Sequence, residues 1–233
     1  MLAGVRAMVE RELEVLVDAD AVARRAASVV AASIRAAPDL PDGFSFAVSG
    51  GRTPWRMFGY LAAIDVPWDR VAIWQVDERV APQSDPDRNL TSLIASLPEP
   101  ARGSVRPMPV EAEDLEAAAA EYADALPAIF DLVHLGLGDD GHTASLVPGD
   151  PALEVRDRLV AITGEYRGRR RMTLTYPALD HAVQIVWLVT GADKSEPLRR
   201  LLEGDRSIPA GRVAAARQRV LADRAAAGDL AEG

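Results

Sequence analysis

The 233-residue sequence contains no cysteine, which excludes disulfides, thiol nucleophiles and thiolate metal sites. Positive charge is also scarce: 26 Lys and Arg stand against 35 Asp and Glu, for a net charge of −9. Proteins that bind nucleic acids normally carry a basic surface, so we expect no nucleic-acid partner. An anionic ligand would need a local basic site within this acidic chain.

Long apolar runs are missing as well. No uninterrupted apolar stretch approaches the roughly 18 residues of a membrane span, and charges interrupt residues 1–20 before a signal peptide could form. With 48% hydrophobic and 26% charged residues, the composition is ordinary for a globular protein. We therefore expect a cytoplasmic protein without a membrane partner, folded as a single domain over 1–233 and either monomeric or weakly dimeric.

Short apolar runs alternate with helical segments along the chain. Strands are predicted at 44–51, 70–79, 131–138, 158–164, 171–179 (breaking at Pro177) and 184–189. Helices are predicted at 20–37, 53–64, 88–97, 113–130, 195–204 and 216–230. Continuous apolar strands of this kind are typical of a parallel sheet buried on both faces. We expect an α/β fold, a three-layer sandwich around a mostly parallel, doubly wound sheet.

Three of the predicted strands end in reactive polar residues. Their ends read SGGRTP, DER and GDDGHT. In open parallel sheets, ligands bind outside the carboxyl ends of the strands. The three polar ends therefore predict one common site.

The segment SGGRTP is a candidate phosphate-binding loop. Gly50 and Gly51, after Ser49, permit close backbone approach, and the N–H groups of the following helix attract anions. The Arg52 guanidinium and the Thr53 hydroxyl would add charge-assisted hydrogen bonds. The same residues also fit a plain strand-to-helix turn. The segment matches neither a Walker loop nor G-x-G-x-x-G, so it does not imply a nucleotide.

His142 is the candidate general base, because an imidazole titrates near neutrality and can take a proton from water. Asp140 is the nearest carboxylate that could set its tautomer, and a loop histidine without a role is the alternative. A metal site is less favoured, since the three histidines are not paired at i, i+3 or i+4. Serine hydrolase chemistry is also less favoured, because the chain lacks G-x-S-x-G.

Three further charged segments each allow a functional and a plain interpretation. Asp77, Glu78 and Arg79 are either a solvated strand end or part of a site. Residues 167–175 gather four arginines, which form either a solvated basic patch or a phosphate contact. Lys194 begins a helix, where its charge opposes the helix dipole, although a solvated lysine is also compatible with that position.

Taken together, these segments resemble the 6-phosphogluconolactonases. The resemblance rests on the segments SGGRTP, VDERVAP with DRN after it, GLGDDGHTASLVP, RMTLTYPAL and VTGADKSEPL. They occur in the family's order and span roughly Phe44 to Gly204. The resemblance implies a cytosolic enzyme of the oxidative pentose phosphate pathway. It also implies hydrolysis of 6-phospho-D-glucono-1,5-lactone to 6-phosphogluconate, with neither a metal nor a cofactor.

The resemblance also implies roles for matching residues. The family's water-activating histidine corresponds to His142, and the acid and arginine lining the site correspond to Asp77 and Arg79. The positions associated with phosphate binding correspond to the SGG loop with Thr53, Arg171 and Lys194. Two positions depart from the family pattern: many relatives have Ser in place of Arg52, and Asn is common in place of Asp180.

Two relatives of the lactonases are alternatives. Glucosamine-6-phosphate deaminases share the fold and D-G-H, but their catalytic Glu lies five residues past the histidine, where this chain has Val147. The sugar-phosphate sensing domain of certain bacterial repressors is a non-catalytic alternative. That domain is joined to a DNA-binding helix-turn-helix, for which this acidic chain has no obvious room.

Overall fold

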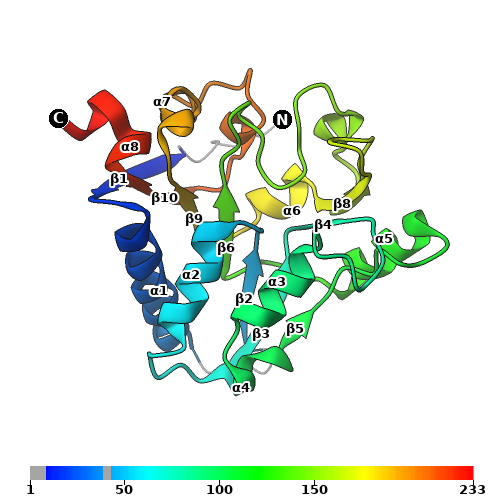
Figure 1. Cartoon of the computed structure of the whole chain (residues 1–233). Coiled ribbons are helices and arrows are strands. Elements are labelled where there is room, and N and C mark those ends of the chain that lie inside the picture. Colours follow the sequence, from blue (N-terminus) through cyan, green and yellow to red (C-terminus); the bar gives the residue numbers. More distant parts are fainter. Residues whose placement is uncertain (1–8, 39–42, 233) are drawn as a thin grey trace, which may run out of the picture.

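The computed structural model describes residues 9–38 and 43–232 (Figure 1). Its main sheet has seven strands in the order β1-β10-β9-β6-β2-β3-β5, and every neighbouring pair is parallel. The strands are β1 (Glu10–Leu16), β2 (Phe44–Val48), β3 (Val71–Gln75), β5 (Val105–Arg106), β6 (Leu132–Gly136), β9 (Ile185–Val189) and β10 (Arg217–Asp223).

Helices cover both faces of this sheet. One face packs against α1 (Ala19–Ala36), α2 (Arg52–Leu61), α3 (Asn89–Ser96) and α4 (Glu99–Arg102). The other face packs against α5 (Leu115–Ala125), α6 (Tyr176–Asp180), α7 (Ser195–Leu202) and α8 (Arg224–Ala227). Short 3₁₀ turns complete the chain: η1 (Trp68–Arg70), η2 (Pro151–Glu154), η3 (Ala192–Lys194), η4 (Ala210–Arg212) and η5 (Gly228–Glu232).

Side chains of the central strands alternate between two hydrophobic clusters. On β9, Val186 and Leu188 belong to the cluster that contains α1 and α2, whereas Ile185, Trp187 and Val189 belong to the cluster that contains α5 and α7. Successive strand residues point to opposite faces, so this alternation defines two buried layers around one sheet. The predicted three-layer α/β fold is confirmed.

A small antiparallel sheet departs from the single predicted sheet. It pairs β4 (Asp77–Arg79), β8 (Arg171–Leu174) and β7 (Val160–Ile162). The strand predicted over 70–79 divides at Val76, whose N–H donates to the Val48 carbonyl of β2 while its own carbonyl accepts from Leu174 N–H of β8. Val76 thereby joins the two sheets and turns the DER segment out of the main sheet.

The helix predicted over 216–230 is wrong. Residues Arg217–Asp223 form β10 between β1 and β9, and only Arg224–Ala227 is α-helical. Pairing with two strands and burial of residues such as Val220 and Leu221 outweigh the helix propensity of the alanine-rich segment. Strand β1 was not predicted. None of the helices in the described residues has the length and apolar character needed to cross a membrane.

Candidate active site

A pocket of about 440 Å³ opens at the carboxyl ends of β2, β3 and β6, which are adjacent in the main sheet. Nine of the predicted site residues line it: Ser49, Gly50, Gly51, Arg52, Asp77, Arg79, His142, Arg171 and Lys194. Six lining side chains are cationic (Arg52, Arg79, Arg88, Arg167, Arg171 and Lys194) and three are carboxylates (Asp77, Asp87 and Asp139). The pocket is therefore a basic site within an acidic protein, as an anionic ligand requires.

The SGG segment places the start of α2 at this pocket. Gly51 has φ of +140°, and among the described residues no side chain caps the N-terminus of α2. Gly50 lies against Asn89, because a Cβ at position 50 would come within 2.1 Å of Asn89 Oδ1. The first N–H groups of α2 are thus left for a ligand, which supports the predicted anion-binding role.

Thr53 and Asp140 do not line the pocket directly. The Thr53 hydroxyl lies 3.0 Å from the Thr190 hydroxyl, at the end of β9. Asp140 contacts His142 from behind. A phosphate contact from Thr53 stays a prediction.

A buried histidine, His134, is hydrogen-bonded to the backbone of the SGG segment. The Ser49 N–H donates to His134 Nδ1 at 3.2 Å, and His134 lies inside β6 as predicted. Burial lowers the pKa of His134 from 6.5 to about 3. The imidazole is therefore neutral at physiological pH, with its proton on Nε2.

We expect His134 to make the fold sensitive to acid. Below pH 6.5 the unfolded chain binds a proton at this residue and the folded chain does not until about pH 3. Stability is therefore present above pH 6.5 and falls as the pH drops, by about 1.4 kcal/mol per pH unit. In His134→Asn, whose amide oxygen can still accept from Ser49, the loss of unfolding free energy between pH 7 and pH 5 should be about 2 kcal/mol smaller than in the wild type.

Urea unfolding at both pH values measures this difference. His181→Asn, at an exposed histidine, is the matched control and should leave the pH dependence unchanged. Equal pH dependence in the wild type and in His134→Asn would contradict the assignment.

The loop after β6 holds His142 in a fixed position. Gly138 N–H donates to the His142 carbonyl at 2.8 Å, and Gly141 N–H donates to the Gly138 carbonyl at 3.1 Å. A Cβ at position 138 would lie 2.0 Å from His142 Nδ1, so only glycine leaves room for the ring. Gly141 has φ of +80° and a Cβ there would meet Ile208 at 2.7 Å. A side chain at either position would therefore clash with its neighbours, so the loop that carries His142 requires both glycines.

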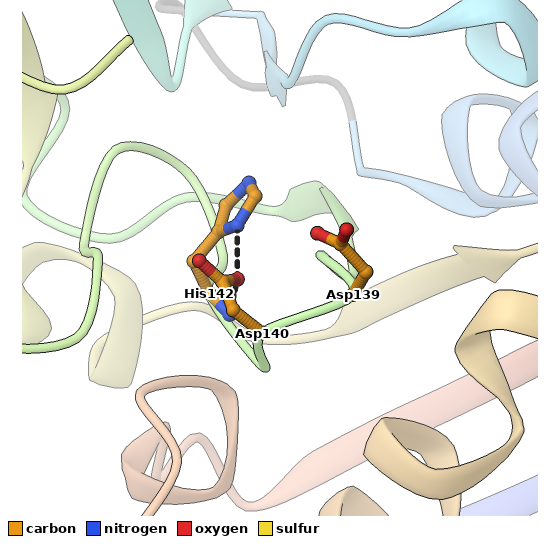
Figure 2. Close-up of side chains that lie close together, drawn as sticks. All are labelled: Asp139, Asp140 and His142. Carbon is orange, nitrogen blue, oxygen red and sulfur yellow. Dashed lines mark hydrogen bonds and ion pairs between the residues drawn. The ribbon is translucent and has the colours of Figure 1, made fainter.

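Asp140 orients the imidazole. Its Oδ1 lies 2.5 Å from His142 Nδ1 and also accepts the His142 N–H at 3.0 Å. Burial raises the pKa of Asp140, but the hydrogen bonds and the charge of His142 lower it more, and the net pKa lies below the ordinary value. The ionised carboxylate holds the proton on Nδ1. Figure 2 shows the other ring nitrogen pointing away from both Asp139 and Asp140, which leaves Nε2 able to accept a proton.

Asp139, Asp140 and His142 also offer metal ligand atoms within 4.8 Å of one another. The nearest nitrogen, Nδ1, is already hydrogen-bonded to Asp140, so a metal ion there would have to replace that bond. The two aspartates are exposed, and Asp139 is paired with Arg167 at 3.6 Å. These contacts favour a base dyad over a metal site.

The DER segment carries polar side chains from β4 into the pocket. Asp77 is buried and accepts a 2.6 Å hydrogen bond from the Ser145 hydroxyl. Arg79 donates to Asn89 Oδ1 at 2.6 Å and to the Asp87 carbonyl at 2.7 Å. The segment thus forms part of the pocket and is not a solvated strand end.

Arg171 and Lys194 both line the pocket, from β8 and η3 respectively. Arg171 lies on β8 with Nη1 3.5 Å from the Ser145 hydroxyl, and burial lowers its pKa although Asp77 opposes this. A guanidinium remains charged even so. Lys194 ends η3 and pairs with Asp193 at 2.9 Å, and this bond lowers the pKa of Asp193. Of the arginines at 169–171, only Arg171 lines the pocket.

Sequence reasoning did not single out several residues at or beside the pocket, namely Arg88, Asn89, Ser145, Tyr166 and Arg167. Arg88 is buried and pairs with Glu78. DRN and GHTASL contain three of the five, but their contacts depend on packing between segments far apart in the chain. Two residues depart from the family pattern. Arg52 lines the pocket, whereas Asp180 accepts the Ala214 N–H at 2.6 Å and is not among the lining residues.

The fold and the site define an α/β protein with a basic ligand pocket at the carboxyl ends of a parallel sheet. Residues 17–222 match the family described as Glucosamine-6-phosphate isomerases/6-phosphogluconolactonase. A 6-phosphogluconolactonase of Synechocystis sp. is 36% identical over 203 residues, 80% of this chain and 83% of that protein. The chain belongs to this family, and the predicted family and the prediction of an enzyme are confirmed.

Solved structures of other proteins share the fold of this chain. The crystal structure of a 6-phosphogluconolactonase from Shewanella baltica OS155 has a TM-score of 0.83 and 27% identity, covering 92% of this chain and 98% of that one. The structure of a monomeric glucosamine-6-phosphate deaminase also has a TM-score of 0.83, covering 93% of this chain and 98% of that one. At 19% identity, this second likeness shows the fold alone.

Proposed function

We propose that the chain hydrolyses 6-phospho-D-glucono-1,5-lactone to 6-phospho-D-gluconate, a step of the oxidative pentose phosphate pathway, with His142 as general base. One observation carries the proposal: His142 Nδ1 is fixed by Asp140, and the ring lines a pocket rich in cationic side chains. An oriented base beside a phosphate site is what hydrolysis of a phosphorylated ester needs. The cytoplasmic location and the monomeric or weakly dimeric state stay predictions.

The proposed reaction begins with phosphate binding. The SGG segment at the start of α2, together with Arg171 and Lys194, holds the phosphate and thereby the lactone ring. A water molecule attacks the carbonyl carbon as His142 Nε2 takes its proton. The tetrahedral intermediate collapses with cleavage of the bond to the ring oxygen, and the imidazolium returns the proton to that oxygen.

Arg79 is the favoured partner of the oxyanion. Stabilising an oxyanion requires donors aimed at the developing charge. The N–H groups of Gly141 and His142 already donate to the Gly138 carbonyl and to Asp140. Arg79 lines the pocket and, after donating through Nη1, has further N–H groups.

Deaminase activity is disfavoured by the residue at position 147. Val147 is buried and has no acid–base group at the position where deaminases carry their ring-opening Glu. Freshly prepared 6-phosphogluconolactone, followed against its spontaneous hydrolysis, tests the proposal directly. Glucosamine 6-phosphate with ammonia release as readout tests the rival in parallel. Binding of sugar phosphate without turnover of either compound would instead support a sensor.

Lys194→Ala should mainly weaken substrate binding. The side chain lines the pocket, and loss of a charge-assisted contact there should raise KM about 10-fold with little change in kcat. Steady-state kinetics with the lactone measure both constants. Arg199→Ala is the matched control, because Arg199 lies on α7 but pairs with Glu196 and Glu203 outside the pocket. A fall in kcat alone would exclude Lys194 from phosphate binding.

A further inference from the structure

A tight hairpin joins β7 to β8, and its Arg167 lines the pocket. Tyr166 and Arg169 pair through both backbone hydrogen bonds, at 3.0 and 3.3 Å. The two residues between them, Arg167 and Gly168, have φ of +52° and +78°, as the two central residues of a type I′ turn require. Arg169 anchors the hairpin by pairing with Asp85 at 2.7 Å. The hairpin is therefore held in a defined position.

The Tyr166 side chain contacts the base dyad. Its hydroxyl donates to Asp140 Oδ2 at 3.2 Å, while Oδ1 of the same carboxylate contacts His142 Nδ1. The Tyr166 and His142 rings meet edge to face with centroids 5.7 Å apart. Burial and the charge of Asp140 raise the pKa of Tyr166, so the phenol keeps its proton and remains a donor.

The same ring also contacts two cations of the pocket. The guanidinium carbons of Arg167 and Arg171 each lie 5.1 Å from the centroid of the Tyr166 ring. The other contacts of the Arg171 side chain are loose: Nη1 lies 3.5 Å from the Ser145 hydroxyl, Asp77 acts through its charge, and Nε has no hydrogen-bond partner among the described residues. The face of the tyrosine ring thus helps to hold this arginine in place, since cations are attracted to aromatic faces at such distances.

We propose that Tyr166 is a positioning residue that acts on both halves of the site: its hydroxyl fixes Asp140 for His142, and its ring fixes Arg171 for the substrate phosphate. This inference rests on the proposed lactonase function and deepens it. Tyr166 lies outside the motifs on which the family resemblance depends. A carboxylate that accepts on both oxygens cannot rotate away from Nδ1, and an arginine stacked on a ring loses less freedom when it binds phosphate.

Two substitutions separate the two contacts. Tyr166→Phe keeps the ring and removes the hydroxyl, so kcat should fall about 3- to 10-fold while KM stays within about twofold. Tyr166→Leu removes the ring as well, so KM should also rise, by about 5- to 10-fold. Tyr60→Phe is the matched control, because Tyr60 donates to Asp20 on the surface in the same way. Its kinetics should equal those of the wild type.

A double-mutant cycle with Asp140→Asn tests whether the hydroxyl acts through Asp140. In the Asp140→Asn background, Tyr166→Phe should change kcat less than about twofold. If the two substitutions instead lower kcat independently, or if Tyr166→Phe alone changes nothing, the hydroxyl does not position Asp140 and the inference is overturned. A merely structural role would lower the stability of the variant without this split between kcat and KM.

Binding of 6-phosphogluconate, measured by calorimetry, separates this inference from the proposed function. If the wild type turns over no lactone, the proposed function fails. The part of the inference in which the Tyr166 ring positions Arg171 is then tested by binding alone. Tyr166→Leu should then bind 6-phosphogluconate about 5- to 10-fold more weakly than the wild type, and Tyr166→Phe should bind it equally well. Equal binding by the wild type and Tyr166→Leu, or no binding by the wild type, would overturn the inference.

Discussion

His142→Ala should lower kcat for 6-phosphogluconolactone hydrolysis by about 10²- to 10⁴-fold, the usual contribution of a general base. The expected loss is large because the base is already oriented: Asp140 holds Nδ1, and the glycine at position 138 leaves room for the ring. KM should change little, since the proposed phosphate contacts come from other segments. Rates have to be measured above the spontaneous opening of the lactone.

Two controls make this result specific. Urea unfolding should show that His142→Ala is folded, since the loop is held chiefly by backbone hydrogen bonds. Added imidazole should restore part of the activity, because the truncated side chain leaves space beside Gly138 where a free base can enter. A rate equal to that of the wild type would remove His142 from the chemistry.

Among the substitutions proposed for this protein, Glu78→Ala should cause the largest loss of stability. Glu78 is fully buried and accepts hydrogen bonds from the backbone N–H groups of Arg79, Asn89 and Leu90, each at 2.8 Å. It also pairs with Arg88, itself buried, at 3.5 Å. Removing Glu78 takes the acceptor from these three N–H groups and leaves the buried Arg88 with the half-exposed Glu111 as its remaining ion pair, so the free energy of unfolding should fall by about 3–5 kcal/mol.

Glu111→Ala is the matched control for this substitution. Glu111 pairs with the same Arg88 at 3.3 Å but is itself half exposed. Its removal leaves Arg88 paired with Glu78 and should cost about 1 kcal/mol or less. Chemical denaturation of both variants and of the wild type provides the comparison. A loss below 1 kcal/mol in Glu78→Ala would mean that Arg88 finds other compensation, and the network would not depend on Glu78.

The sequence allowed the site to be predicted because its main parts are local. Each of the segments SGGRTP and GDDGHT carries its glycines, its strand end and its reactive groups within a few residues. Parallel strands then bring their carboxyl ends to one edge without further information. His142 and Asp140, two residues apart, are the clearest case, since both lie in one short loop and contact each other there.

What could not be predicted depends on long-range packing. Tyr166 and Asp140 are 26 residues apart, and no spacing in the sequence indicates that they meet. The segment 217–223 becomes a strand because β1 and β9 lie on either side of it, whereas its own alanines favour a helix. Likewise, nothing in the apolar run before DER indicates that Val76 divides it between two sheets.

That division at Val76 has a consequence for how the pocket can open. The small sheet carries Asp77 and Arg79 on one strand and Arg171 on the next, whereas the loops of the main sheet carry the SGG segment and His142. The pocket thus lies between the main sheet and the small sheet, which the backbone of Val76 joins. If the two sheets separate, the proposed phosphate-binding residues and the proposed base lose the opposite side of the pocket together, so affinity and turnover should be lost at the same time.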